Sequence, residues 1–392
     1  MSDGTLSYTF GTLESAGHAE AVERLCERLE EIEGSGFYSE VAVERPWSKH
    51  NPLLSGEFGR TRPIRWFLER ELHKLARQGA TISVRPSREA MGLEDPALFA
   101  AVDEGAWDIR QKKLFLFGPE RTVLSMNRLE HYTATRADDF QRYVLFTNYA
   151  MHVESFLDRF PDAIRPSREG VQMPAYHHVL PGQLGVTLVN IGVGPSNAKT
   201  ITDHVAVLRP DVMLMVGHCG GLRNHQEIGD LVLAQGFMRD DHVLDAVLPR
   251  SVPVLSNHLL NELLLEALDA RKLAFRMGNV YTTANRNWEF NQERTIAEIR
   301  LSRSIAIDME SGTIAANGFR YRIPTATLLC VSDKPLHGRP KLSDAAQAFY
   351  RTTRQWHVEI AVEVISRVRE GWPGGLPTTD LRSPDEPLFG TL

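Results

Sequence analysis

The second half of the chain alternates short apolar runs with helical patterns, and this alternation constrains the fold more than any other feature. The runs are rich in Val, Ile and Leu, and they cover 184–191, 211–216, 279–283, 304–308 and 325–331. Continuous apolar strands joined by helices are typical of a sheet that is buried on both faces. The sequence therefore predicts an α/β fold with a mixed, largely parallel sheet flanked by helices.

The first third of the chain predicts a smaller α+β domain. Apolar residues recur at helical spacing over 22–32, and a second helical pattern starts at Pro63. Strand-like runs follow at 80–84 and 113–117. The aromatic-rich segment 140–160 is interpreted as a helix. We expect an N-terminal domain over 1–139, a helical linker or interface segment over 140–183, a second domain over 184–371 that carries the motifs described below, and an extended tail over 372–392.

Composition excludes several classes of protein. The 392 residues include 44 Lys and Arg against 50 Asp and Glu, which gives a net charge of −6 and argues against a protein that coats nucleic acid or an anionic membrane. No window is long and apolar enough for a membrane span, and the N-terminus has no signal-peptide pattern. Cys26, Cys219 and Cys330 form no CxxC pair, so neither a disulfide scaffold nor a metal site is predicted. We expect a cytoplasmic protein.

Two glycine-rich segments follow predicted strands, where α/β sheets bind ligands. In 192–199, glycines allow a ligand to approach the backbone, and the following helix N-terminus favours an anion. A plain tight turn is the alternative. In 216–222, glycines on both sides of His218 indicate a backbone-lined pocket floor, with a packed turn around a buried histidine as the alternative.

Two carboxylates also stand at predicted strand ends. Glu310 follows an apolar strand and begins an Ala-rich helix, where it is either a site residue or a helix cap. Asp333 ends the last apolar strand, where it is either a site carboxyl or a turn residue. Trp288 lies on a polar loop, which suits stacking on a heterocycle; a tryptophan that covers the surface is the alternative.

Together and in this order, the motifs resemble the nucleoside phosphorylase and hydrolase superfamily, most closely its AMP nucleosidase family. The matching stretches are VLFTNY (144–149), TLVNIGVGPSNAKTI (187–201), LRPDV (208–212), VGHCGGL (216–222), RDDHVLDAVLP (239–249), NWE (287–289), AIDMES (306–311) and LLCVSDKPLHG (328–338). The resemblance is weaker over the first third, where VRPSRE (84–89) and RLEHYTAT (128–135) are similar to the family's N-terminal domain.

The resemblance implies hydrolysis of the N-glycosidic bond of AMP to adenine and ribose 5-phosphate. Asp333 matches the acid that protonates the purine, and Glu310 matches the carboxylate that binds the ribose hydroxyls and stabilises an oxocarbenium-like fragment. Trp288 would stack on the purine, with Asn287 beside it. The substrate-binding set that the resemblance implies is Gly194, Ser196, Lys199, Gly217, His218, Cys219, Gly220, Asn287, Trp288, Met309, Ser332 and Lys334.

One departure from the superfamily pattern bears on the reaction. Phosphorylases carry an arginine three residues before the small hydroxyl residue of their G-(S/T)-C-G motif, and these places hold Met215 and His218 here. A methionine cannot bind phosphate through paired hydrogen bonds, so hydrolysis is favoured over phosphorolysis. The 5′-phosphate of the substrate still needs cations, and the candidates nearest the motifs are Lys199, Lys334, Arg339 and Lys341.

Two alternatives stay open at this point: a phosphorylase or nucleosidase acting on another purine nucleotide or nucleoside, and a non-catalytic nucleotide sensor on the same fold. The resemblance implies no cofactor for the chemistry, allosteric control by Mg-ATP or phosphate, and a homo-oligomer, commonly a hexamer. The partner that it implies is a small nucleotide, with no nucleic acid and no membrane.

Overall fold

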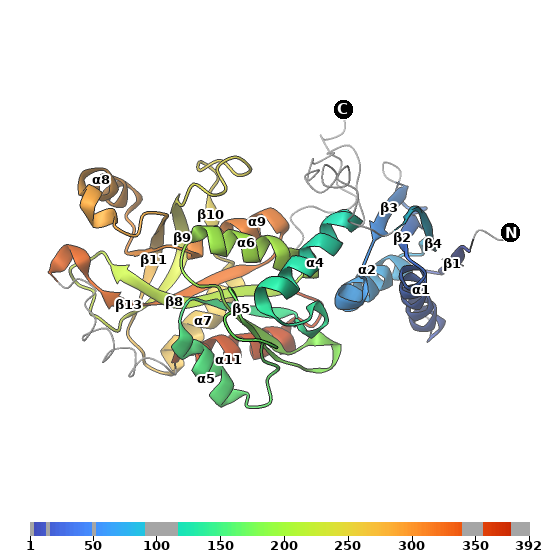
Figure 1. Ribbon diagram of the computed structural model, residues 1–392, viewed down its shortest axis with the longest axis horizontal. Helices are drawn as coiled ribbons and strands as arrows, with labels where there is room; N and C mark the ends of the chain where they lie inside the picture. The colour runs from blue at the N-terminus through green and yellow to red at the C-terminus, as the bar shows by residue number, and fades with distance from the viewer. Residues whose placement is uncertain (1–3, 13–15, 49–51, 91–116, 339–355, 378–392) are drawn as a thin grey trace. The chain divides into compact units, whose positions relative to one another are not determined.

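The computed structural model describes residues 4–12, 16–48, 52–90, 117–338 and 356–377, which fall into two compact units (Figure 1). The first unit holds the described residues up to Arg128 together with 207–209, and the second holds the others. Part of the predicted strand over 113–117 and most of the predicted tail over 372–392 lie outside the described residues.

The N-terminal unit is built on a four-stranded antiparallel sheet in the order β1-β4-β2-β3. Its elements are β1 (Leu6–Thr9), α1 (Ala16–Gly34), β2 (Phe37–Glu44), β3 (Leu53–Phe58), α2 (Arg65–Arg77) and β4 (Thr81–Ala90), and α4 (Pro119–Thr133) runs on into the second unit. Val22, Leu25 and Leu29 are fully buried on one face of α1, as their helical spacing predicts. The predicted α+β character of this part is confirmed.

The second unit contains a nine-stranded mixed sheet in the order β10-β9-β11-β12-β8-β5-β7-β6, with β13 paired to both β8 and β9. Its strands are β5 (Tyr143–Thr147), β6 (Ala175–His178), β7 (Val186–Asn190), β8 (Val212–Gly221), β9 (Leu231–Asp240), β10 (Val254–Leu255), β11 (Phe275–Thr283), β12 (Ala306–Asp308) and β13 (Thr325–Asp333). The pairings β9–β11–β12–β8–β13–β9 close a ring of five strands.

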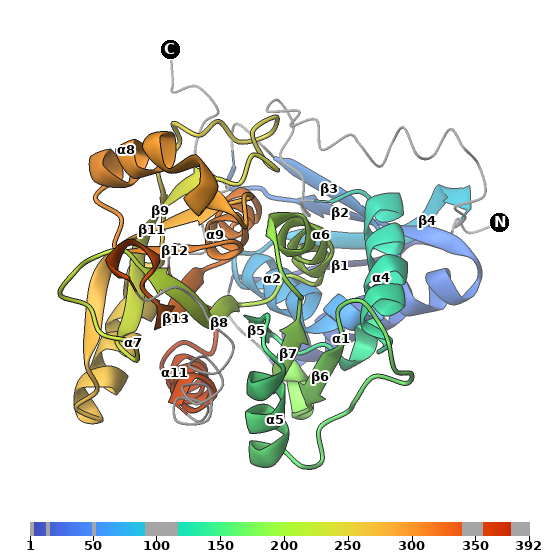
Figure 2. The same cartoon turned by 60° about the vertical axis from the view of Figure 1, so that its left-hand side comes forward.

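Helices cover both faces of this sheet, as Figure 2 shows. The helices are α5 (Ala150–Arg159), α6 (Pro195–Val205), α7 (His258–Ala270), α8 (Gln292–Ser302), α9 (Ser311–Tyr321) and α11 (Trp356–Gly371). Helices α5, α7 and α11 pack together on one face, while α6 and α9 pack together on the other. The predicted α/β fold, with a mixed sheet between helical layers, is confirmed. Among the described residues, no helix has the length and apolar character needed to cross a membrane.

Two predicted elements are wrong. The segment 140–160, expected as one helix, begins with strand β5, and only its second half forms helix α5. Every residue of β5 is buried because the strand lies between β7 and β8, with which it pairs in parallel. The segment 140–183 therefore contributes β5, β6 and α5 to the sheet unit and is not a helical linker. The segment 216–222, expected as a loop, continues strand β8 as far as Gly221.

Small residues allow helix α9 to lie close to the sheet. A Cβ added to Gly318 would lie 2.2 Å from Thr325 Cγ2 and 2.9 Å from the backbone oxygen of Ile323. Gly318→Ala should therefore lower the free energy of unfolding by about 1–3 kcal/mol, although alanine ordinarily favours a helix. Urea denaturation measures the effect.

Gly371→Ala, at the end of α11, is the matched control, because a Cβ there meets nothing within 4 Å. Equal stability of the Gly318→Ala protein and the unmodified protein would contradict the close approach of α9 to β13.

Candidate active site

The carboxyl of Glu310 joins three segments that are distant in the sequence. Glu310 directly precedes α9 and is 2% exposed. Its Oε1 accepts a hydrogen bond of 2.7 Å from the Gly194 amide, and its Oε2 accepts one of 3.2 Å from Asn148 Nδ2. The segments after β5, β7 and β12 therefore meet at this carboxyl. Two of the predicted site residues, Glu310 and Gly194, are in direct contact.

A second carboxylate, Asp308, holds the beginning of α9 in place. Its Oδ2 accepts a hydrogen bond of 2.9 Å from the Ser311 amide, and its Oδ1 accepts one of 2.7 Å from Thr282 Oγ1. Because Asp308 takes this amide, Glu310 makes no side-chain cap and stays available to Gly194. Burial, together with the negative charge of Asp308, raises the pKa of Glu310 to about 8.

The segment 192–199 follows β7, as predicted, but only 192–194 is loop, because helix α6 begins at Pro195. Gly194 adopts φ 111° and ψ 156°, a conformation that is essentially restricted to glycine. In this conformation the amide of Gly194 donates its hydrogen bond to Glu310 Oε1. Ser196, also a predicted site residue, is exposed in the first turn of α6.

Asp333 ends strand β13 at an irregularity of the strand register. The register shifts between Val331 and Asp333, so that Asp333 lies opposite Gly220 of β8. A Cβ added to Gly220 would lie 3.5 Å from Asp333 Oδ2, so the glycine leaves room for this carboxyl. Ser332 Oγ lies 2.6 Å from Asp333 Oδ1, to which it donates, and 3.3 Å from the backbone oxygen of Cys219.

The predicted pocket floor over 216–222 is a buried strand, and this corrects the expected loop. A Cβ on Gly217 would lie 3.6 Å from Asn148 Oδ1. This part of β8 therefore lies beside Asn148, the residue that donates a hydrogen bond to Glu310. The ring of His218 packs edge-on against Tyr149, with centroids 4.3 Å apart. Cys219, one of the implied substrate-binding residues, is buried. Glycines within the strand thus allow the Asn148 amide and the Asp333 carboxyl to approach β8 closely.

The two described cations among those proposed for the 5′-phosphate already have partners. Lys199 Nζ forms an ion pair of 2.7 Å with Asp203, one turn further along α6. Lys334 is buried, and its Nζ donates a hydrogen bond of 2.9 Å to the backbone oxygen of Asn224. Arg339 and Lys341 lie outside the described residues.

The aromatic candidate is not on an open loop. Trp288 is 5% exposed and packs in an apolar cluster with Leu222, Tyr281, Ile299 and Ile307. It begins a short 3-10 helix, so the expected exposed aromatic is corrected to a buried one. Asn287, beside it, is exposed, and Met309 is half-buried directly before Glu310.

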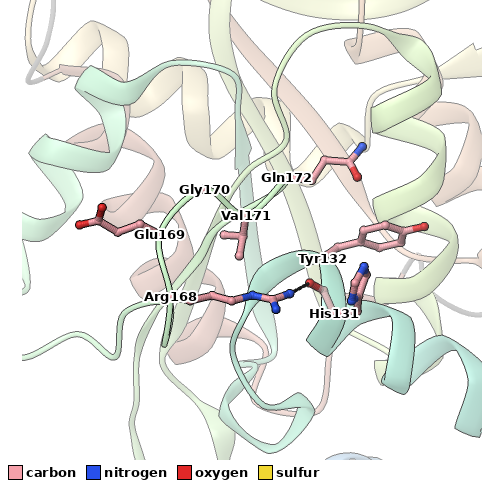
Figure 3. A pocket seen from close by; sticks show the side chains of 7 residues that line it. All are labelled: His131, Tyr132, Arg168, Glu169, Gly170, Val171 and Gln172. Carbon is pink, nitrogen blue, oxygen red and sulfur yellow. Dashed lines mark hydrogen bonds between the residues drawn. The ribbon is translucent and has the colours of Figure 1, made fainter.

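A separate cavity of about 380 Å³ opens between the end of α4 and the loop before β6 (Figure 3). Arg168 Nη2 donates a hydrogen bond of 3.2 Å to the backbone oxygen of His131 there, and the ring of Tyr132 stacks on His204. The lining residues are His131, Tyr132, Arg168, Glu169, Gly170, Val171 and Gln172. None of them belongs to the predicted site.

Sequence reasoning missed two polar residues, one that bonds to Glu310 and one that caps the helix following it. Asn148 lies within the VLFTNY stretch and Asp308 within AIDMES, yet neither was assigned a role. Asn148 Oδ1 is buried, and no donor among the described residues reaches it. A polar residue directly after an apolar strand is the signal that would have singled out both.

The family model of the phosphorylase superfamily matches residues 144–368. This range includes the strands of the larger sheet, apart from the first residue of β5, as well as Asn148, Gly194, Glu310 and Asp333. At the level of the fold, a uridine phosphorylase from Vibrio fischeri is similar, with a TM-score of 0.52 and 14% identity over 59% of this chain and 93% of its own.

Relatives define the family more narrowly. AMP nucleosidase of Escherichia coli K12 is 40% identical over 91% of this chain and 90% of its own length. The crystal structure of AMP nucleosidase from Bacteroides thetaiotaomicron matches with a TM-score of 0.54 and 27% identity over 64% of this chain and 99% of its own. The chain therefore belongs to the AMP nucleosidase family of the phosphorylase superfamily. The resemblance drawn from the motifs is confirmed, and so is the class of enzyme, an N-glycosidase.

The raised pKa of Glu310 predicts a specific dependence of stability on pH. Between about pH 5 and pH 8, folded Glu310 keeps a proton that the unfolded chain has lost, because its folded pKa is about 8. The contribution of this group to the free energy of unfolding is therefore complete at low pH and falls as the pH rises through this window. Glu310→Gln removes it, so the Tm of the variant relative to the unmodified protein should rise from pH 5 to pH 8.

Thermal denaturation across this pH range measures the difference. Glu359→Gln, at an exposed position on α11, is the control and should leave the profile unchanged. Parallel profiles for the Glu310→Gln and unmodified proteins would show that burial does not hold a proton on Glu310.

Proposed function

We propose that the chain hydrolyses the N-glycosidic bond of AMP and releases adenine and ribose 5-phosphate. The observation that carries the proposal is the 40% identity to AMP nucleosidase of Escherichia coli over 91% of this chain, which includes both site carboxyls. The fold alone does not determine the substrate, because one fold can host many activities. The substrate therefore depends on the residues of the site.

In the proposed reaction, a water oxygen forms a bond to C1′ of the ribose as the bond from C1′ to N9 of adenine breaks. The electron pair of the broken bond goes to the purine, and Asp333 donates a proton to the base, at N7. The proton that the water loses restores the proton on Asp333. The position of Asp333 at the end of β13, with room provided by Gly220, supports its role as the acid.

Glu310 is proposed to bind the ribose hydroxyls and to stabilise the positive charge that develops on the sugar. Each of its oxygens accepts one hydrogen bond from the protein and has a further lone pair for a hydroxyl donor. Asn148 Oδ1 supports the same placement, because a buried acceptor with no donor costs about 1–3 kcal/mol, which a ligand hydroxyl would recover. In the ionised state, Glu310 stabilises an oxocarbenium-like fragment electrostatically.

Product analysis tests the reaction directly. Incubation with AMP should release adenine and ribose 5-phosphate in buffer without inorganic phosphate, and added phosphate should leave the identity of the products unchanged. The assay repeated with ATP would test for activation. Ribose 1-phosphate products, or faster turnover of adenosine, would favour a phosphorylase or a nucleosidase of other specificity. Binding of AMP without turnover would instead indicate a sensor.

The role of Asp333 is tested by Asp333→Asn, which keeps the size of the side chain but removes the acid. The rate of adenine release should fall by about 10²–10⁴-fold with the fold intact by circular dichroism. Asp269→Asn, at an exposed position on α7, is the matched control and should retain full activity. Activity of the Asp333→Asn protein close to that of the control would remove Asp333 from the mechanism.

A further inference from the structure

Three buried histidines meet on the face of the sheet covered by α5 and α11. His152 comes from α5, His218 from β8 and His357 from α11, and none is more than 5% exposed. Each offers one ring nitrogen, and these nitrogens all lie within 4.8 Å of one another. Three elements far apart in the sequence therefore direct imidazoles toward one point.

The spacing of the rings agrees with a shared tetrahedral ligand. Zn–N bonds of 2.0–2.1 Å place two coordinating nitrogens about 3.3 Å apart and two ring centres about 5.2 Å apart. The centroid distances are 5.4 Å for His152–His218, 4.9 Å for His152–His357 and 5.3 Å for His218–His357. His152 Nε2 and His357 Nδ1 lie 3.1 Å apart. The ring centres of all three pairs, and the nitrogens of the His152–His357 pair, are thus close to the spacing around a single metal ion.

The surroundings also suit metal ligation, because an outer polar partner reaches one of the rings. The second nitrogen of His152, Nδ1, lies 2.7 Å from Thr147 Oγ1. Such an outer partner fixes the tautomer and the orientation of a ligating histidine.

A simple hydrogen bond between two histidines does not account for the third. The contact of 3.1 Å requires only His152 and His357, whereas His218 lies at nearly equal distances from both rings. For ligation, the proton of His152 resides on Nδ1, where Thr147 Oγ1 accepts it, and Nε2 then offers its lone pair. No net proton is taken up or released by this change of tautomer.

We propose that His152, His218 and His357 form a binding site for a divalent transition metal of the zinc class, with water as the fourth ligand. The bound metal ties α5 and α11 to strand β8. This site goes beyond the proposed function, because its role is to join these elements and no step of the AMP reaction passes through it. It also goes beyond the sequence, which predicts no metal site.

The test uses the full chain without a polyhistidine tag, freed of metal with a chelator and titrated with Zn²⁺ or Co²⁺. The protein should bind close to one ion per chain, its Tm should rise with Zn²⁺ concentration, and Co²⁺ should give the visible spectrum of a four-coordinate site. His357→Gln should weaken binding by at least about 100-fold, since loss of an outer partner alone typically costs 10–100-fold.

Two control variants separate this site from other histidines. His177→Gln alters an equally buried histidine that bonds to Thr135 and Thr187, and His242→Ala removes an exposed histidine beside Asp240 and Asp245. Both proteins should bind the metal as the unmodified chain does. Loss of binding in the His242→Ala protein would identify an adventitious surface ion and overturn the proposal.

X-ray absorption on the unmodified zinc-loaded protein provides a readout that does not depend on whether a variant folds. The expected first shell contains three imidazoles, and a shell dominated by carboxylate oxygens would overturn the proposal. So would the absence of binding at micromolar metal. Because none of these measurements uses AMP, failure of the metal site leaves the proposed hydrolysis unaffected, and the reverse also holds.

Discussion

The hydrogen bond from the Gly194 amide to the buried carboxyl of Glu310 joins the start of α6, which follows β7, to the start of α9, which follows β12. The amide begins α6, and the carboxyl precedes α9, the helix against which α6 packs. Asp308 makes this bond available, because it caps α9 in place of Glu310. Two carboxyls at one helix N-terminus are also favoured by the helix dipole. The cap of α9 and the carboxyl that binds the Gly194 amide are thus different residues, two positions apart.

The alternation of apolar runs and helices was enough to predict the layered sheet, because a strand buried on both faces has no polar residues to interrupt it. The same property explains the error over 140–160. Because every residue of β5 is buried, the strand shows no alternation of apolar and polar residues, and α5 begins only three residues after the strand ends. Periodicity alone therefore could not separate the strand from the helix. The glycines of 216–221 were misinterpreted for a related reason. Glycine marks loops in general, but here it leaves space beside a continuous strand for Asp333 and Asn148.

The residues of the candidate site also divide into those that the sequence could predict and those that it could not. Glu310 and Asp333 were predictable because each follows an apolar strand, and the order of motifs suggested their chemistry. The contacts of Asn148 were not predictable, because they depend on β5 and β7 placing two loops against the start of α9. Trp288 was misplaced because a polar neighbourhood in sequence does not reveal the apolar cluster that receives its ring. The histidine cluster is a further case, since its members are separated by most of the length of the unit.

The closed ring of five strands determines when, during folding, the residues of the candidate site come together. Strand β13 completes the ring by pairing with β8 and β9, although all of α7, β11, β12 and α9 lie between β9 and β13 in the chain. Pairings over such long separations form slowly, because the intervening chain must first be ordered. Asp333 is the last residue of that final strand. During synthesis, the earlier strands can assemble while Asp333 is still absent, so the chain gains its complete pair of site carboxyls only at closure.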